Sequence, residues 1–339
     1  MEDSRNTSID AAKLLAAFGV VMIHLAPSTP SAELLSQVFL RFAVPYFLTI
    51  ALYFFIEKAS GMDRLRISEF RLDRILVPYL FWTFLYLTMR FVKHRIQHTP
   101  HDSDLISALF YGGSAVQLYF LPLLLLFEAQ ASAVILLFRK RAFRITGIIV
   151  LVGAIVFGHF ASHHDYFGFE QCLERGFVYV LFALLLSYCQ SSTPGRRVNV
   201  VSGGVIAILI VAATVGNWYP GWLSYLGGPL AGYSIAALAL NLRVPAAGTT
   251  QRFVLGCSYG IYLAHVLFLE IFQFAASKLG LEIVPYSVIT KVMMSFLICS
   301  CCVLLIRISR SNRISAYLML GEAARRPKVA LLDGQSVAA

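Results

Sequence analysis

Charged residues are scarce in this chain of 339 residues: only 14% are Asp, Glu, Lys or Arg. Hydrophobic residues make up 58% of the chain, and the mean hydropathy is +0.72. Ordinary soluble domains carry about a quarter charged residues, so this composition excludes a typical soluble enzyme. It indicates an integral membrane protein.

Recognisable metal and redox motifs are also missing. The six cysteines show no metal-ligand or redox spacing, and most lie in apolar segments, where cysteine behaves as a small apolar side chain. A stretch rich in histidine, residues 159–165, has no repeated ligand spacing either. We therefore expect no metal site and no permanently bound cofactor.

Apolar segments long enough to cross a bilayer, which takes about 20 residues each, account for most of the chain. They predict an all-α polytopic membrane protein with about ten transmembrane helices. We expect residues 1–308 to form a single transmembrane domain and residues 309–339 to form a polar cytoplasmic tail. We expect the first segment to be a span and not a cleaved signal peptide, because it lacks a basic flank and a small-residue cleavage site. The predicted spans are 9–27, 34–56, 75–93, 116–138, 145–161, 172–190, 199–217, 222–240, 253–275 and 287–307.

Basic residues are unevenly distributed between alternate loops. With a cytoplasmic N-terminus, 20 of the 28 Lys and Arg residues fall in segments on the cytoplasmic side. The positive-inside rule therefore predicts that both termini are cytoplasmic. We expect a multi-pass protein of the inner (plasma) membrane. The net charge of +10 then reflects topology and attraction to lipid headgroups, and no nucleic-acid partner is expected.

The first apolar segment, SIDAAKLLAAFGVVMIHLAP, carries three ionisable residues, Asp10, Lys13 and His24. Ionisable side chains inside a span are costly and usually functional. Lys13 and His24 are eleven residues apart, so on an α-helix they share a face, about 16 Å apart along the axis. Asp10 lies one turn before Lys13. The alternative is structural: Lys13 extends to the interface beside Asp10, and His24 lies near the far interface.

Arg71 and Arg74 lie one helical turn apart at the start of the third predicted span. Two guanidinium groups on one face offer several planar donors for phosphate oxygens. The alternative interpretation is that the pair only sets topology as part of the positive-inside pattern. A further arginine, Arg175, precedes the aromatic stretch GFVYVLF within the sixth predicted span.

These motifs together resemble the membrane acyltransferase-3 family. The resemblance rests on Asp-x-x-Lys followed by His24, and on Arg-x-x-Arg followed by Pro-Tyr and a Trp. The stretch SYGIYLAH, 258–265, is similar to a late family signature. The second helix departs from the pattern, since Ala51 and Leu52 replace a Ser-Gly pair.

The resemblance implies an O-acyltransferase that moves an acyl group, most commonly acetyl, from acyl-CoA to a hydroxyl of a carbohydrate or cell-surface glycan. Acetyl-CoA is then a co-substrate, and the partners are the glycan or lipid-linked acceptor, membrane lipids and other envelope-polysaccharide enzymes. Two alternatives stay open: a transporter or flippase for a glycan precursor, and a catalytically inactive relative. The implied site consists of His24 as the catalytic base, Lys13, Arg71 and Arg74 as acyl-CoA-binding residues, and Asp10 and Arg175 in support.

Overall fold

The computed structural model describes residues 6–60, 72–97, 114–139, 169–216, 221–242, 244–245, 248–280 and 286–322. These residues form helices and, apart from an isolated bridge between Pro27 and Tyr286, no β-structure. The predicted all-α class is therefore confirmed. The helices are α1 (Thr7–Ile23), α2 (Pro30–Ser60), α3 (Leu72–Gln97), α5 (Phe120–Arg139), α7 (Phe169–Gln190), α8 (Thr193–Val215), α9 (Gly221–Asn241), α10 (Thr249–Leu255), α11 (Ser258–Lys278), α12 (Val288–Ser311) and α13 (Arg313–Leu320).

Several helices are long and apolar enough to cross a membrane. Five in the described part of the chain meet this condition, namely α2, α3, α8, α11 and α12, and shorter apolar stretches lie in α5 and α7. The chain is thus a multi-pass helical membrane protein. The count of ten spans stays a prediction, and the span predicted at 145–161 lies outside the described residues.

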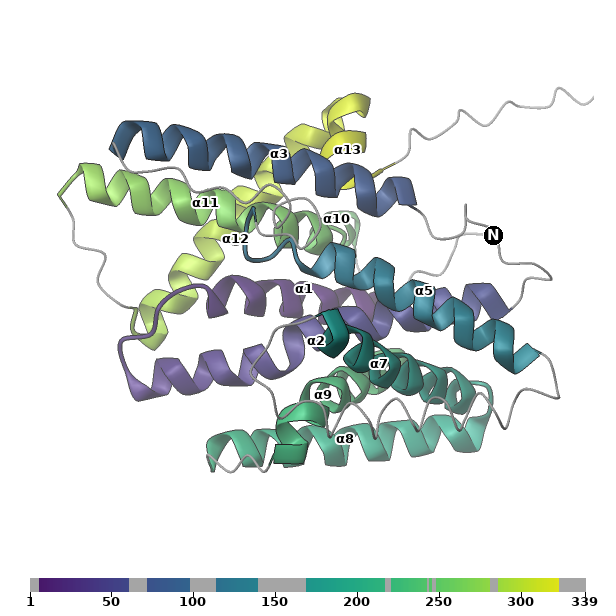
Figure 1. Cartoon of the computed structure of the whole chain (residues 1–339). Coiled ribbons are helices and arrows are strands. Elements are labelled where there is room, and N and C mark those ends of the chain that lie inside the picture. The colour runs from purple at the N-terminus through teal and green to yellow at the C-terminus, as the bar shows by residue number, and fades with distance from the viewer. Residues whose placement is uncertain are drawn as a thin grey trace, which may run out of the picture.

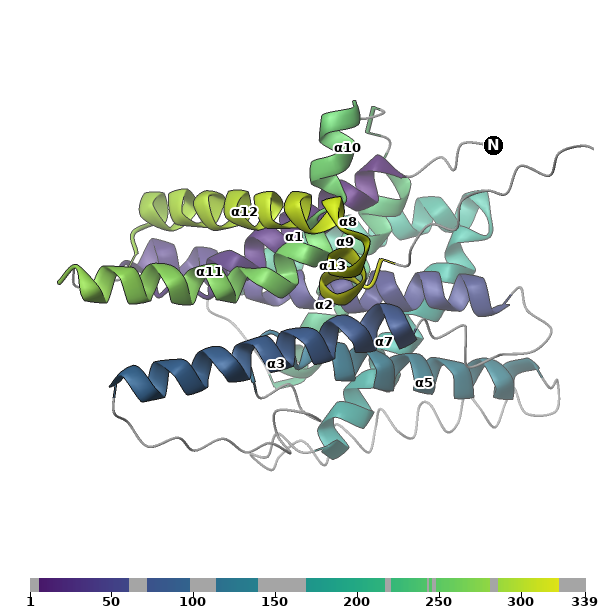
Figure 2. The ribbon, with the colours of Figure 1, turned by 90° about the horizontal axis from the view of Figure 1, so that it is seen from above.

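The span predicted at 253–275 is wrong as a single helix. The chain forms α10, turns at Gly256 and Cys257, and continues as α11. At the turn, the N–H of Cys257 donates to the Val254 carbonyl oxygen at 2.9 Å, a tighter turn than an α-helix makes. Figure 2 shows α10 standing across the direction of α11 and α12. The apolar run continues through this turn, so hydropathy did not reveal it.

Part of the predicted C-terminal tail is folded. The helix α13 packs against α3 and α12, and the indole N–H of Trp82 on α3 donates to the Met319 carbonyl oxygen at 2.9 Å. The helix ends at Gly321 in the left-handed conformation, with φ 63°, which glycine adopts without a Cβ penalty. Of the residues predicted as tail, 309–311 thus complete α12 and 313–320 form a helix packed on α3.

The helix α1 lies near the middle of the bundle (Figure 1). It packs against α2, α9, α10, α11 and α12, and nine of its residues are buried. At Gly19 a Cβ would collide with the ring of Phe39 on α2, so this glycine allows the two helices to approach closely. The central position of α1 brings its polar residues inside the protein.

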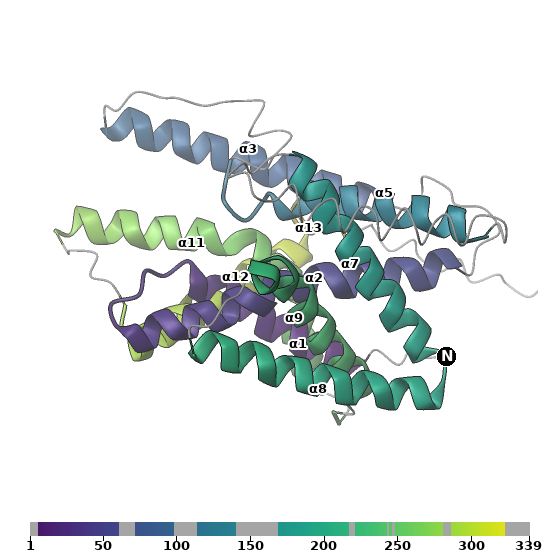
Figure 3. The same cartoon turned by 60° about the horizontal axis from the view of Figure 1, so that its bottom comes forward.

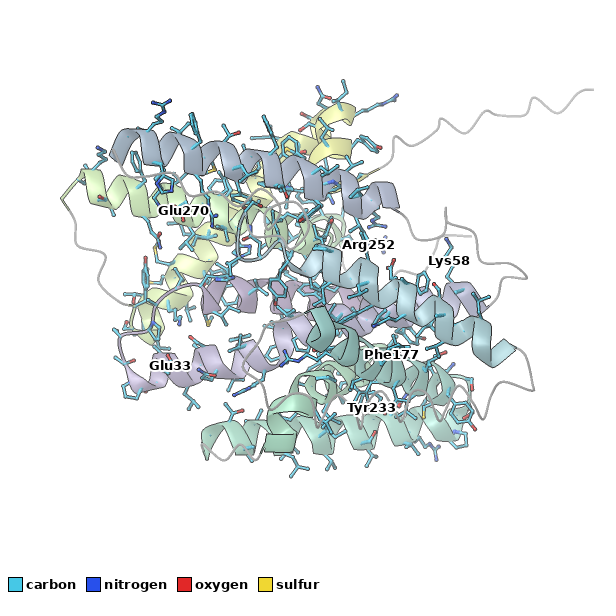
Figure 4. All side chains as sticks on the ribbon, viewed as in Figure 1. Glu33, Lys58, Phe177, Tyr233, Arg252 and Glu270 are labelled. Atoms are coloured by element: carbon cyan, nitrogen blue, oxygen red, sulfur yellow. The ribbon has the colours of Figure 1, made fainter. Side chains whose placement is uncertain are left out.

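The remaining helices surround this centre. Figure 3 shows α8 on the side of the bundle opposite to α3. The helix α9 packs closely on α2, where Gly232 faces the Pro45 carbonyl and the side chain of Thr49. Figure 4 shows Glu33 and Glu270 toward one end of the bundle and Lys58 toward the other. Lys93 on α3 pairs with Glu270 at 2.7 Å, so that end of the bundle carries basic as well as acidic side chains.

Candidate active site

The site begins where α1 ends. His24 is the C-terminal cap of α1, and its backbone N–H donates to the Val21 carbonyl oxygen at 3.2 Å. Beyond it, the Tyr286 N–H donates to the Ala26 carbonyl oxygen at 2.7 Å. Pro27 follows, and the residue before a proline is disfavoured in helical conformation. These features end the helix at this point and tie the segment that follows His24 to the start of α12.

His265 of α11 lies beside His24. The two imidazole ring centroids are 5.2 Å apart, and the ring planes are inclined by 27°. His265 is fully buried, with 0% of its surface exposed, whereas His24 is partly exposed. The fold therefore brings together histidines from opposite ends of the sequence. The sequence identified His24 as a site residue and matched His265 only to a motif, so their proximity was not predicted.

The hydrogen bonds of His265 define its tautomer. Its Nδ1 lies 2.8 Å from the Tyr262 carbonyl oxygen and 3.2 Å from the Ile261 carbonyl oxygen. A carbonyl oxygen only accepts hydrogen bonds, so Nδ1 carries the proton and Nε2 is the acceptor of the neutral ring. Nε2 is buried and has no hydrogen-bond partner among the described residues. A lone pair is thus available beside His24.

The turn of α11 that carries His265 is fixed by side chains from outside that helix. The Tyr86 hydroxyl of α3 donates to the Leu263 carbonyl oxygen at 2.8 Å and accepts from the Leu267 N–H at 3.2 Å. These two groups are paired in a regular α-helix, so Tyr86 is inserted into the helical ladder. The Gln117 side-chain amide also donates to the Leu263 carbonyl at 3.4 Å, and the Tyr262 hydroxyl donates to the Gln117 carbonyl.

Aromatic rings surround the neighbouring Tyr262. Its ring centroid lies 5.2 Å from that of Phe120, 6.0 Å from that of Phe47 and 6.1 Å from that of His265. Such apolar walls strengthen hydrogen bonds and charge interactions in their vicinity. The histidine pair therefore lies against a largely apolar environment.

Lys13 and Asp10 lie on α1, toward the end away from His24. The Lys13 ammonium is 5.4 Å from the centroid of the Phe54 ring on α2, within the range of a cation–π contact. Asp10 is buried in the first turn of α1, with 7% of its surface exposed. The positive end of the helix dipole favours a carboxylate there. At the rise of an α-helix, about 1.5 Å per residue, the separation of Lys13 and His24 along the chain corresponds to about 16 Å along the axis of α1.

Two of the three predicted arginines, Arg74 and Arg175, lie among the described residues. Arg74 is exposed near the start of α3, and its backbone carbonyl accepts a hydrogen bond from the Tyr259 hydroxyl of α11 at 3.4 Å. Arg71 lies outside the described residues. Arg175 is exposed on α7. The structure thus connects the turn of Arg74 to the helix that carries His265.

A family model for an acyltransferase domain, Acyl_transf_3, matches residues 6–307. The chain belongs to the acyltransferase-3 family. No curated protein and no solved structure matches the chain. Family membership and the helices long enough to span a bilayer together make the protein a membrane acyltransferase.

Ala51 and Leu52 replace the Ser-Gly pair that the resemblance implies for the second helix. Ala51 is partly buried and Leu52 is fully buried in the core of α2. The Leu52 side chain therefore contributes to packing, and neither residue offers a hydroxyl. Within the part of the chain that the structure describes, no group of three or more His, Cys, Asp or Glu residues is arranged to hold a metal ion. The His-rich stretch 159–165 lies outside that part.

Proposed function

We propose that this acyltransferase transfers an acetyl group from acetyl-CoA to a hydroxyl of a carbohydrate or cell-surface glycan in the inner membrane. The main supporting observation is the partly exposed imidazole of His24 beside the buried imidazole of His265. An acyltransferase that uses a hydroxyl acceptor needs a base to remove the hydroxyl proton. Histidine is the side chain whose ordinary titration range suits that role near neutral pH.

His24 is the proposed base. As the hydroxyl oxygen attacks the thioester carbonyl, its proton passes to the free nitrogen of His24. The carbon–sulfur bond then breaks, and His24 returns the proton to the departing sulfur, so that CoA leaves as a thiol. Donors near the carbonyl oxygen stabilise the negative charge that develops there. Transfer from a thioester to an alcohol is downhill and requires no ion gradient.

Lys13, Arg71 and Arg74 are the proposed anchors for the CoA phosphates, with Asp10 and Arg175 in support. Lys13 supports this role because it is a cation on the same helix as His24, about 16 Å away along the axis. With the nucleotide held at the Lys13 end, the pantetheine arm extends along α1 and brings the thioester to His24. The acceptor is then acylated near the outer leaflet, while CoA stays on the cytoplasmic side.

Comparison of surface glycans from cells with and without the protein tests this function. Mass spectrometry of the isolated glycan should show a mass increment of one acetyl group per modified sugar only when the protein is present. Membranes containing the protein should also transfer label from acetyl-CoA to glycan from the deficient cells. Unchanged glycan masses together with unlabelled glycan would contradict the proposal and favour the transporter or the inactive relative.

A further inference from the structure

His265 has a ring nitrogen that lacks a partner in a fully buried position. Its Nδ1–H is held by the Tyr262 carbonyl at 2.8 Å, and its Nε2 has no hydrogen-bond partner among the described residues. Native proteins pair nearly all buried polar atoms, because an unpaired buried acceptor loses its hydrogen bonds to water without replacement. A hydrogen-bond donor to the Nε2 lone pair would therefore stabilise the folded protein.

His24 is positioned to supply that donor. The two ring planes are within 27° of parallel, and the centroids are 5.2 Å apart. Two coplanar imidazoles joined by an N–H···N hydrogen bond of about 2.9 Å have their centroids about 5 Å apart. The structure holds the two rings in a stacked arrangement, so the hydrogen bond requires rotation of the His24 ring about its last side-chain torsion, which has a broad energy well. Hydrogen bonds of this kind often tighten only when substrate binds.

We propose that His265 is a positioning residue for His24: its Nε2 accepts a hydrogen bond from the N–H of His24. This role rests on the proposed function, in which His24 is the base. A continuous chain of hydrogen bonds then runs from the substrate hydroxyl through His24 and His265 to the Tyr262 carbonyl. Because His265 is held in one tautomer, it also selects the tautomer of His24 whose unprotonated nitrogen faces the hydroxyl.

During transfer, His265 exchanges no proton. The hydroxyl proton moves to the free nitrogen of His24, the new carbon–oxygen bond forms, the carbon–sulfur bond breaks, and the same proton leaves on the CoA sulfur. While His24 is an imidazolium, its second N–H remains bonded to His265 Nε2, which spreads the positive charge over the pair. Active sites that use a base commonly orient it through a third group in this way.

The surroundings of His265 hold the ring in place for this role. Tyr86 and Gln117 bind the Leu263 carbonyl within the same turn of α11, and the two carbonyl contacts at Nδ1 restrict rotation of the imidazole. His24, by contrast, is the partly exposed member of the pair. The fixed ring is thus the acceptor, and the more accessible ring meets the substrate.

The test uses two variants of His265 in the full-length protein reconstituted in lipid nanodiscs. His265→Phe keeps an aromatic ring of similar volume without the acceptor, and His265→Gln keeps a side-chain oxygen that accepts from His24. The probes are labelled acetyl-CoA and surface glycan isolated from cells lacking the protein. We expect His265→Phe to lower the turnover number about 100-fold, within the range lost with a general base, with the KM for acetyl-CoA unchanged within about twofold. His265→Gln should recover at least a tenth of wild-type turnover.

A double-substitution cycle identifies the residue through which His265 acts. In the His24→Asn background, His265→Phe should cause no further loss, since residues that act as one unit are non-additive. Equal turnover of wild type and His265→Phe would overturn the positioning role of His265. So would additive losses of turnover from His24→Asn and His265→Phe in the cycle. A His265→Gln variant that is folded but as slow as His265→Phe would also overturn it. A wild-type protein that transfers no acetyl group would instead overturn the proposed function itself.

Discussion

His24 lies at the end of α1, beside α11. It caps the helix next to a buried imidazole and is itself partly exposed, whereas Asp10 is buried in the first turn. A base must reach both its substrate and the group that orients it, and the end of α1 allows both. At the residue scale, the division between an accessible and a buried histidine is the main support for the proposed chemistry.

The arginines offer a separate prediction at this scale. Arg71→Ala or Arg74→Ala should raise the KM for acetyl-CoA about 10- to 100-fold, since each removes charge-assisted hydrogen bonds worth about 1.5–3 kcal/mol. Arg→Lys variants should rescue only in part, because an ammonium lacks the planar fork of a guanidinium. Transfer rates measured against acetyl-CoA concentration test this. If both Ala variants show the same dependence of transfer rate on acetyl-CoA concentration as wild type, the arginine pair contributes only to membrane orientation.

The sequence indicated candidate site residues, but it did not predict which side chains they contact. The cost of ionisable groups in a span directed attention to Lys13 and His24, and the structure places Lys13 on α1 and His24 at its C-terminal cap. Sequence reasoning did not place His265 beside His24, because that contact depends on how α1 and α11 pack. Nor did it anticipate Tyr86, whose role depends on a hydroxyl inserted into the backbone of another helix.

At the scale of elements, hydropathy located most of the described helices to within several residues, because each presents a continuous apolar run. It failed where the chain turns without a polar break, between α10 and α11. It also did not indicate α13, an eight-residue helix too short to be a span and stabilised by its contact with α3. Short-range patterns thus predict apolar segments, while turns inside them depend on local backbone geometry.

The contact between α1 and α2 gives a prediction for element packing. Gly19→Ala should lower the thermal unfolding midpoint, because its Cβ meets the Phe39 ring and overpacking a core costs about 1–3 kcal/mol. Gly204→Ala on α8 is the matched control, since nothing lies within 4 Å of a Cβ there. Unfolding of both variants in the same detergent compares them directly. If Gly19→Ala is as stable as Gly204→Ala, the close approach of α1 to α2 is not required.

At the scale of the whole molecule, the mechanism depends on which end of the bundle faces the cytoplasm. The positive-inside asymmetry predicts that the loops 57–74 and 139–144 are cytoplasmic and that 94–115 and 159–171 face outward. The end that carries Lys58 lies opposite to the ends that carry Glu33 and Glu270 (Figure 4). The orientation of the bundle in the membrane therefore stays a prediction.

Cysteine labelling tests the orientation. In a variant without native cysteines, Asp102→Cys should react with a membrane-impermeant thiol reagent in intact cells. Arg141→Cys should react only after the cells are opened. The reverse labelling pattern would show that the protein has the opposite orientation, and it would exclude binding of cytoplasmic acetyl-CoA at the Lys13 end of α1.

The central claim, that His24 is the base of an acyl transfer, is tested most directly by His24→Asn. Asparagine keeps hydrogen-bonding capacity but cannot take up the proton, so glycan acetylation should fall about 10²–10⁴-fold while the amount of protein in the membrane, measured by immunoblot, stays at the wild-type level. His94→Asn on α3 serves as the matched histidine control and should acetylate normally. Near-normal acetylation by His24→Asn at equal expression would contradict the account.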